Sequence, residues 1–277
     1  MIVKPKNVDE LLDIIHLDNG KHYFLAGGTD INILIKKRVI TDEKIIYINH
    51  LKDLKKIKRE NGNVFIGALS TYKDVFESDI MKRFFPFLLS SLEHFASPLI
   101  QTLATVGGNI ANGSPTNDIS PLLLVLNAKL KIISQQNERI VYLKDFYTGY
   151  KKNILKNNEI IAEIIIAEDA ENDYITYYKK VASRNILAIS KLSLAGLKKV
   201  TDDKIEKIKI AVGSLNEYPR RLFKLEEYLK NKSINQIDFT FLRKILTEEI
   251  TPISDFRSDK EYRFEVCQNL ITEFLAK

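Results

Sequence analysis

The chain has 277 residues, a formal net charge of +6 and 45% hydrophobic residues, a composition typical of a water-soluble globular protein. This length allows one large domain or two ordinary ones with a sizeable apolar core. The single cysteine, Cys267, excludes an internal disulfide, a cysteine-rich zinc site and an iron–sulfur cluster held by this chain alone. The positive charge is a poor indicator of nucleic-acid binding, because acidic residues are interspersed with the lysines throughout.

No segment is typical of a secretion signal or a membrane span. The N-terminal stretch MIVKPKNVDELL lacks a long apolar region and a small-residue cleavage site. The most apolar run, at 121–126, is far shorter than the roughly 20 residues that cross a bilayer. By elimination we expect a cytoplasmic protein. We interpret the densest basic patch, KDLKKIKR at 52–59, as a solvated helix or loop face.

The first part of the chain alternates helix and strand. Apolar residues at helical spacing follow Asn7, whose side chain suits an N-cap. Further on, a tight glycine turn joins a strand to an amphipathic helix, and we expect Asp30 to cap that helix. The expected elements are a helix from Val8, strands at 22–26 and 44–48, and a helix at 31–38.

The second part, after Leu51, contains the least ordinary stretch, TVGGNIANGSPTNDISP at 105–121. Small, amide and proline residues crowd this stretch, so we expect a loop. Before it, Ser70-Thr71 with Asp74 opens a short helix, and Pro98 interrupts a longer one. The expected elements are strands at 63–67, 129–133 and 159–167, and the longer helix at 80–95.

An acidic, turn-like segment at 168–173 predicts a linker to a further domain. Strands followed by helices indicate an α+β fold there, with a hairpin connection at 198–203. Cys267 falls on an apolar helix face and is interpreted as core packing. The expected strands are 174–181, 192–200 and 204–212, and the expected helices are 221–230, 237–248 and 259–274.

Two glycine pairs, Gly27-Gly28 and Gly107-Gly108, are the candidate ligand-contacting turns. Glycine lets backbone N–H groups approach a ligand closely, and a helix N-terminus favours an anion such as phosphate. Neither pair fits the Rossmann or the P-loop pattern. From the residues alone, anion binding and a ligand-free tight turn both stay open.

Other polar residues give weaker indications. Asp118 suits either a contact to ribose hydroxyls or an Asx turn. Tyr177-Tyr178 is either strand packing or an aromatic wall beside a planar cofactor. The four histidines, His94 among them, share no metal-ligand spacing, and no serine or cysteine nucleophile motif is present. We therefore expect no metal site and no catalytic side chain.

Taken together, four motifs in order are similar to one family. They are FLAGGTDINILIKKR at 24–38, TVGGNIANGSPTNDISPLLLVLNA at 105–128, YYKKVASRN at 177–185 and PISDFRSDKEYR at 252–263. In this order they resemble the FAD-binding medium subunit of the molybdenum hydroxylases, of the xanthine, carbon monoxide and nicotinate dehydrogenase type. The resemblance covers nearly the whole chain.

The resemblance implies FAD as cofactor and a set of contact residues. The first loop would wrap the FAD pyrophosphate, the second would lie against the flavin and its diphosphate, and four further residues would contact the cofactor. Lys180 and Arg184 would lie on the dinucleotide side. The implied cofactor contacts are Leu25, Ala26, Gly27, Gly28, Thr29, Asp30, Ile31, Phe95, Thr105, Val106, Gly107, Gly108, Asn109, Asp118, Ile161 and Lys180.

The implied fold is α+β. It comprises an FAD-binding domain of the vanillyl-alcohol-oxidase (PCMH) type at 1–170, with two α+β subdomains at about 1–52 and 53–170. A C-terminal domain of the CO dehydrogenase flavoprotein type follows at 171–277, with a three-stranded antiparallel sheet and helices. Having only Cys267, the chain departs from the 4-hydroxybenzoyl-CoA reductase branch, whose flavin subunit holds an extra cluster.

The implied function is electron transfer within a multi-subunit oxidoreductase. Electrons would pass from [2Fe–2S] clusters of a small partner subunit through FAD to NAD⁺ or another acceptor. A molybdenum-cofactor large subunit would complete a heterotrimer or its dimer, without nucleic acid or membrane. Two alternatives stay open: a free-standing FAD-dependent NAD(P)H reductase, and a flavin-free assembly module with the same fold.

Overall fold

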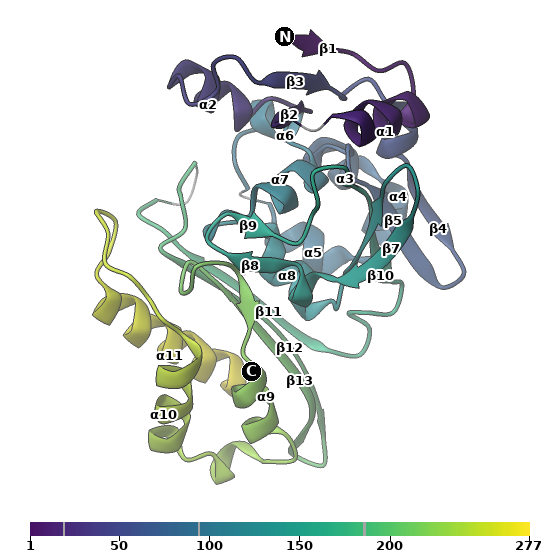
Figure 1. The fold of residues 1–277 in the computed structure, drawn as a ribbon. Coiled ribbons are helices and arrows are strands. Elements are labelled where there is room, and N and C mark those ends of the chain that lie inside the picture. The colour runs from purple at the N-terminus through teal and green to yellow at the C-terminus, as the bar shows by residue number, and fades with distance from the viewer. Residues whose placement is uncertain (19, 94, 185–186) are drawn as a thin grey trace.

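The computed structural model describes residues 1–18, 20–93, 95–184 and 187–277 (Figure 1). His94 and Asn185, the last residue of the third motif, lie outside the described residues. The N-terminal sheet lies at one end of the molecule, and the C-terminal helices lie at the other (Figure 1).

A three-stranded parallel sheet in the order β1-β3-β2 forms the first layer. Helix α1 packs Leu11 and Ile15 into its core, and the Asn7 side chain accepts a hydrogen bond from the Glu10 N–H at 2.8 Å, as expected. The elements are β1 (Ile2–Val3), α1 (Val8–Leu17), β2 (His22–Leu25), α2 (Ile31–Lys36) and β3 (Lys44–Tyr47).

A five-stranded antiparallel sheet in the order β4-β5-β10-β6-β7 forms the centre of the molecule. The largest apolar core lies between this sheet and the helices around it. Its strands are β4 (Ile57–Glu60), β5 (Asn63–Gly67), β6 (Lys129–Ile133), β7 (Glu138–Tyr142) and β10 (Ile160–Ala167), and β8 (Tyr147–Gly149) pairs separately with β9 (Lys152–Asn153). The helices are α3 (Tyr72–Glu77), α4 (Asp79–Phe84), α5 (Pro86–Ser91), α6 (Pro98–Gln101), α7 (Val106–Asn112) and α8 (Ile119–Val125).

Three local predictions in this region were wrong in whole or in part. The helix expected over 80–95 is broken, because Pro86 cannot continue α4 and instead begins α5. The stretch 105–121 is a loop only at 113–118; α7 precedes this loop and the fully buried α8 begins at its end, since burial of apolar side chains outweighs the loop preference of the glycines and prolines there. The basic patch at 52–59 exposes most of its charged side chains, as expected, but it forms a 3₁₀ turn (Lys52–Lys55) followed by the unexpected strand β4.

The C-terminal part is an antiparallel sheet in the order β11-β12-β13-β14 with helices on one face (Figure 1). The expected three strands are present, and a two-residue strand, β14, adds a fourth. Asp202 and Asp203, both at positive φ (49° and 59°), form the two-residue turn between β12 and β13. The elements are β11 (Ile175–Val181), β12 (Leu192–Thr201), β13 (Lys204–Gly213), β14 (Arg220–Arg221), α9 (Phe223–Leu229), α10 (Phe239–Glu249) and α11 (Lys260–Ala276).

Alternating residues of β12 join the two halves of the molecule. Leu194 packs in the core beneath α9, α10 and α11, whereas Ala195 and Leu197 belong to the same core as the central helices. Helix α8 packs against β12 and β13 from that side. Cys267 is fully buried on α11, and burial raises the pKa of its thiol to about 12, as expected for core packing.

No helix among the described residues is long and apolar enough to cross a membrane. The domain boundaries near residues 52 and 170 stay predictions.

The expected acidic linker contains a buried carboxyl group. Glu171 is 7% exposed and accepts a hydrogen bond from the Phe87 N–H at the start of α5, at 2.8 Å. Burial raises the pKa of Glu171 from 4.5 to about 7, against the lowering effect of hydrogen bonds from Phe87 and Leu88. Between these two pH values the folded chain binds more protons than the unfolded chain, so stability falls as pH rises.

We expect Glu171→Gln to remove this dependence. The free energy of unfolding of the variant, relative to the unchanged chain, should rise between pH 5 and pH 8 by about 1–2 kcal/mol. Urea unfolding at both pH values measures it. Glu227→Gln, at an exposed position of α9, is the matched control and should show no such rise. An equal pH dependence in both variants would contradict the assignment.

Candidate functional site

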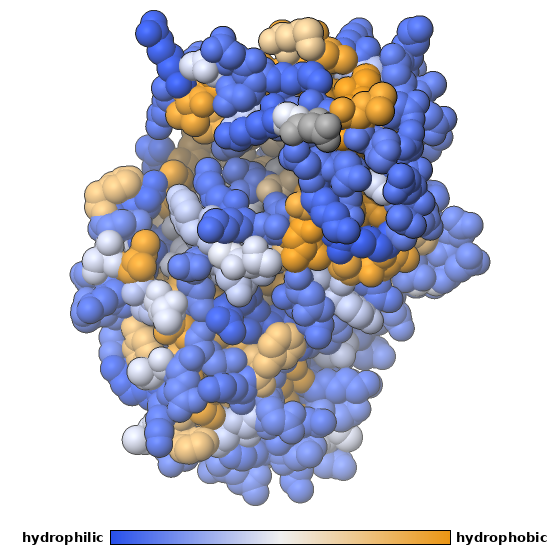
Figure 2. Space-filling view, viewed as in Figure 1, coloured by the Kyte–Doolittle hydropathy of each residue, from blue (hydrophilic) through white to orange (hydrophobic). Residues whose placement is uncertain are grey.

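A first cavity, of about 330 Å³, brings the two glycine motifs together. It is bounded by the loop after β2, by the start of α7 and by β10. Figure 2 shows the surface hollowed below α2 in this region, with apolar residues at its depth. The predicted contact residues that line it are Ala26, Gly27, Gly28, Thr29, Asp30, Ile31, Thr105, Gly107, Gly108, Asn109 and Ile161.

The first loop presents unused backbone donors. Among the described residues, none of the N–H groups of Gly27, Gly28, Thr29 and Asp30 donates a hydrogen bond to the protein. Gly28 has a φ of +75°, a left-handed conformation that favours glycine. Four adjacent free donors beside a cavity are suited to an anionic oxygen-rich group such as a diphosphate.

Gly27 lets the two loops touch. A Cβ atom at this position would lie 1.6 Å from the Leu103 carbonyl oxygen, so a larger residue would force the loops apart. Leu25, at the end of β2, stays outside the cavity lining, and its carbonyl accepts the Ile48 N–H. The first loop is thus held between the parallel sheet and the segment before α7.

The second glycine pair has a different role. The Gly107 N–H donates to the Ala68 carbonyl at 2.8 Å, and the Gly108 N–H donates to the Thr105 hydroxyl that caps α7. A Cβ on Gly107 would lie 2.5 Å from the Ala68 Cβ, so this glycine permits close packing of α7 on the segment after β5. Val106 lies in the core. These N–H groups are therefore already occupied by the protein.

Two polar side chains of the first cavity stand out. Asp30 is the N-cap residue of α2, but its side chain makes no capping hydrogen bond, so the expected capping role was wrong. Its carboxyl instead accepts a hydrogen bond at 3.5 Å from the side-chain nitrogen of Asn112, the last residue of α7. The Asn109 side-chain oxygen is buried and has no hydrogen-bond partner among the described residues. Asn109 thus has an acceptor left for a bound group.

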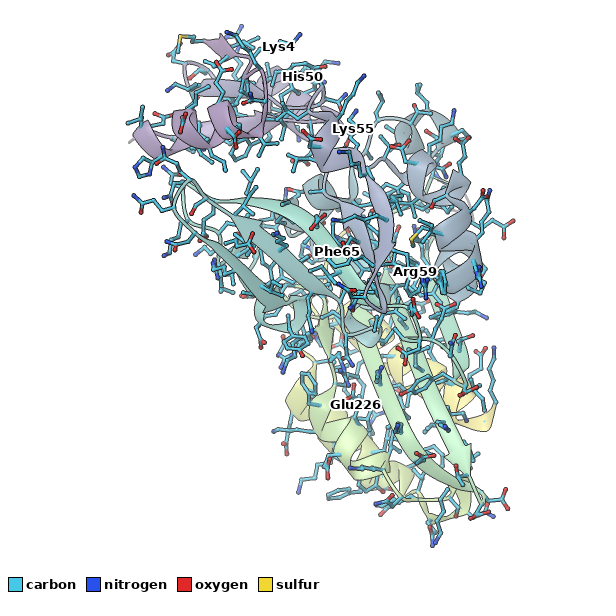
Figure 3. All side chains as sticks on the ribbon, turned by 90° about the vertical axis from the view of Figure 1, so that its right-hand side faces the viewer. Lys4, His50, Lys55, Arg59, Phe65 and Glu226 are labelled. Carbon is cyan, nitrogen blue, oxygen red and sulfur yellow. The ribbon has the colours of Figure 1, made fainter. Side chains whose placement is uncertain are left out.

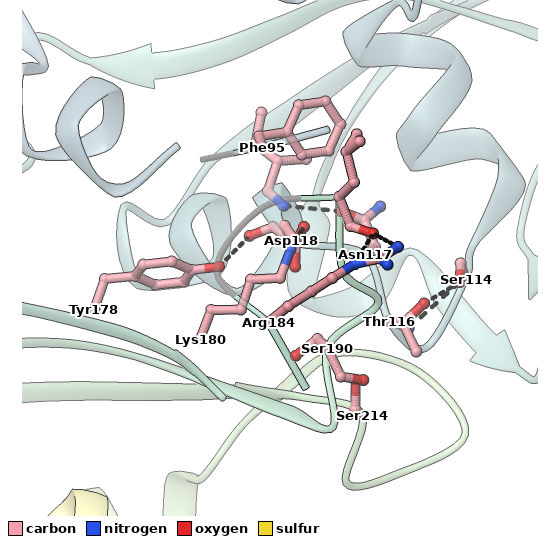
Figure 4. A network of polar contacts seen from close by, with 12 residues as sticks. Phe95, Ser114, Thr116, Asn117, Asp118, Tyr178, Lys180, Arg184, Ser190 and Ser214 are labelled. Atoms are coloured by element: carbon pink, nitrogen blue, oxygen red, sulfur yellow. Dashed lines mark hydrogen bonds and ion pairs between the residues drawn. The ribbon is translucent and has the colours of Figure 1, made fainter. Parts of the chain in front are cut away.

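A second cavity, of about 660 Å³, lies between the α5 region and β11. The remaining predicted residues, Phe95, Asp118, Lys180 and Arg184, line it (Figure 4). The Phe95 ring stacks on Tyr72 with the centroids 4.0 Å apart. The structure therefore distributes the predicted contacts over two cavities, with both glycine loops at the first.

An ion pair between Asp118 and Lys180 is the main charge feature of the second cavity (Figure 4). The Lys180 Nζ lies 2.6 Å from the Asp118 Oδ2. Burial raises the pKa of Asp118, while the charge and hydrogen bond of Lys180 oppose this rise. The second carboxylate oxygen, Oδ1, is buried without a partner among the described residues, so it is available to a ligand hydroxyl.

The Asx turn considered for Asp118 belongs to its neighbour. The Asn117 side-chain oxygen accepts the N–H groups of Ile119 and Ser120, both at 3.0 Å, and so begins α8. Sequence reasoning missed Asn117, although an asparagine two residues before a buried apolar run is a helix-start signal. Leu69 and Leu155 also line the first cavity, but no sequence motif indicated that they would.

The two tyrosines of the third motif lie in different surroundings. Tyr177 is 2% exposed and packs against Phe274, which fits strand packing. The Tyr178 hydroxyl donates to the Asp118 carbonyl at 3.5 Å (Figure 4). The exposed Arg184 donates to the Leu187 carbonyl at 2.8 Å. No group of three metal-ligating side chains occurs among the described residues.

Comparison with known protein families shows to which family this chain belongs. The model of the family described as "FAD binding domain in molybdopterin dehydrogenase" matches residues 1–168. The chain belongs to this family. The model described as "CO dehydrogenase flavoprotein C-terminal domain" matches residues 176–277. The resemblance of the four motifs and the expectation of FAD as cofactor are thereby confirmed, and the chain is an FAD-binding oxidoreductase subunit of the molybdenum hydroxylase type.

Individual relatives match over nearly their whole length. The chain is 29% identical over 269 residues to the glyceraldehyde dehydrogenase medium chain of Sulfolobus acidocaldarius, covering 97% of this chain and 94% of the relative. It is 28% identical to the xanthine dehydrogenase FAD-binding subunit of Escherichia coli O157:H7, covering 96% and 92%. A carbon monoxide dehydrogenase structure from Hydrogenophaga pseudoflava superposes with a TM-score of 0.91 at 24% identity, covering 98% and 94%, which confirms the expected fold.

Removing the partner of Asp118 should destabilise the chain. Lys180→Met leaves a buried carboxylate unpaired, and we expect a loss of about 3 kcal/mol in the free energy of unfolding at pH 7. Lys179→Met is the matched control, because Lys179 is 53% exposed and 3.8 Å from Glu273, and its loss should stay within about 0.5 kcal/mol. Adding Asp118→Asn to Lys180→Met should recover part of the loss. Equal small losses in the two single variants would contradict the pairing.

Proposed function

We propose that this chain is the electron-transfer flavoprotein subunit of a multi-subunit molybdenum hydroxylase. The observation that carries the proposal is the row of four N–H donors at Gly27 to Asp30 that have no acceptor among the described residues and lie beside a cavity, in a chain of the FAD-binding family. Bound FAD would take up electrons from [2Fe–2S] clusters of a partner subunit and deliver them to NAD⁺ or another acceptor. The residues of this chain would bind the cofactor and orient it.

The residues fit such a cofactor in both cavities. The free N–H groups of the first loop suit its diphosphate, and the apolar Ile31 and Ile161 wall the same cavity. In the second cavity, Phe95 offers an aromatic wall and the free oxygen of Asp118 offers an acceptor for a hydroxyl. Lys180 neutralises the Asp118 charge, so the pair can lie beside an anionic cofactor without repelling it.

No side chain of this chain is proposed as a catalytic acid, base or metal ligand. The chain would work in a heterotrimer, or its dimer, with a molybdenum-cofactor large subunit and a [2Fe–2S] small subunit. Since Cys267 is the single cysteine and is fully buried, cluster ligands have to come from another chain. We also propose the functional division into residues 1–170, with parts at about 1–52 and 53–170, and 171–277.

Flavin retention tests the first loop. We expect the purified chain to carry FAD and Gly27→Ala to lose most of it, because the added Cβ displaces the loop from the Leu103 carbonyl. Gly149→Ala is the matched control, since its Cβ would meet only ordinary contacts at 3.6 Å and beyond. Flavin absorbance per chain, with circular dichroism to verify folding, measures the result.

Other outcomes of that experiment favour the alternatives. A chain that stays colourless with added FAD would support the flavin-free assembly module. A flavin-loaded chain that reduces a small molecule with NAD(P)H, at full rate and without partner subunits, would support the free-standing reductase.

Arg184 is proposed to help an acidic dinucleotide dock, because it is exposed and lines the second cavity with Lys180. In the assembled enzyme, Arg184→Ala should raise the KM for NADH about threefold in the NADH-to-dye reaction, the effect of one exposed charge. Arg83→Ala, at an exposed position of α4, should leave this KM unchanged. A KM and a flavin potential both unaffected by Arg184→Ala would remove this role.

A further inference from the structure

A third cavity, of about 490 Å³, lies where the central sheet meets the C-terminal sheet, and it shares no lining residue with the first two. Strands β12 and β13 continue from the central sheet toward the C-terminal end, as the rotated view in Figure 3 shows. The volume is within the range of small-molecule sites. Its lining residues are contributed by both sheets and by the connection at 169–174 that joins them.

The pairing of β12 with β13 gathers lysines at this cavity. Lys199 is the direct cross-strand partner of Lys207, and Lys209 lies two residues further along β13 on the same face. Like charges directly opposite each other on a sheet destabilise the pair. Lys129, from β6 of the central sheet, adds a fourth ammonium group from the other side. The fold therefore concentrates positive charge here at a cost in stability.

The protein itself neutralises this charge only in part. Among the described residues, none of these four lysines forms an ion pair within 4.0 Å or a side-chain hydrogen bond. Two carboxyl groups, of Asp169 and Asp173, also line the cavity, so a net positive charge remains. The four ammonium groups thus keep their donors available.

Two tyrosines restrict where the ammonium groups lie. The Lys209 Nζ is 5.0 Å from the Tyr174 ring centroid, and the Lys129 Nζ is 5.1 Å from that of Tyr142. Half-burial, together with the positive charges of Arg221 and Lys207, lowers the pKa of Lys209 to about 8 against the opposing effect of Glu226 and Asp169. The asparagines of the lining, Asn63, Asn127 and Asn172, add amide donors.

We propose that this cavity, lined by Lys129, Lys199, Lys207 and Lys209, binds a small multivalent oxyanion, with phosphate or carboxylate groups as the contacted chemistry. A bound anion would offset the repulsion between Lys199 and Lys207 and would contact residues of both sheets. Binding therefore favours the docked arrangement of the central and C-terminal sheets. This site is independent of the flavin proposal, because none of its residues belongs to the first two cavities.

The experiment measures thermal unfolding and calorimetric binding of the full chain at constant ionic strength. The probes are inorganic pyrophosphate, orthophosphate and citrate, with chloride as the reference anion. We expect a multivalent anion at about 100 times its Kd to raise the Tm by about 5 °C. Pyrophosphate stronger than citrate identifies a phosphate group, and the reverse order identifies a polycarboxylate.

The test variant combines Lys199→Gln, Lys207→Gln and Lys209→Gln. Without added anion it should be at least as stable as the unchanged chain, because the like-charge repulsion is gone. Its affinity for the anion should fall by about tenfold or more. The matched control, Lys204→Gln with Lys230→Gln and Lys244→Gln, removes the same charge at exposed positions without described side-chain partners and should bind normally.

Three outcomes would overturn the proposal. The first is no anion-specific rise in Tm beyond that of chloride. The second is equal anion binding by the test variant and its control, which would place the anion elsewhere, for example at the first loop. The third is a test variant that binds every probe anion as tightly as the unchanged chain but fails to assemble with partner subunits. That result would assign the lysines to a protein contact.

Discussion

Close approach of two backbone segments at Gly27 is the constraint on which the flavin-binding region depends. The Leu103 carbonyl occupies the space where any side chain at residue 27 would lie. This contact joins the loop after β2, which is anchored to the parallel sheet, to the segment that leads into α7. The first cavity lies between these two parts. A residue with a Cβ would separate its walls, since backbone atoms cannot move aside as a side chain can.

The two glycine pairs are alike in sequence but have different structural roles. Within the part of the chain that the structure describes, the N–H groups of the first loop have no protein acceptor, so this loop can bind an anion. The second pair gives its N–H groups to the Ala68 carbonyl and the Thr105 hydroxyl, and Gly107 serves the packing of α7. The first pair therefore leaves donors for a ligand, whereas the second pair serves the packing of the protein itself.

The three cavities treat charge in different ways. The first combines backbone N–H donors with the Asp30 carboxyl, the second holds the ion pair of Asp118 and Lys180, and the third has four lysine side chains that the protein neutralises only in part. A closed pair can lie beside an anionic cofactor without a net field, whereas an open cluster attracts an anion. The overall charge of +6 reveals none of this, because the arrangement matters more than the sum.

The sequence by itself determined the family, the α+β class, the cofactor and most strands, because four motifs occur in order and apolar alternation is a local property. It also determined that Cys267 cannot hold a cluster. Tertiary structure decided that α7 and the start of α8 flank a shorter loop at 113–118, since the burial of α8 among distant strands outweighs its local loop preference. Only the folded chain paired Asp118 with Lys180 and set Lys199 against Lys207 beside Lys129, because these contacts join residues that strand pairing and packing bring together across the sequence.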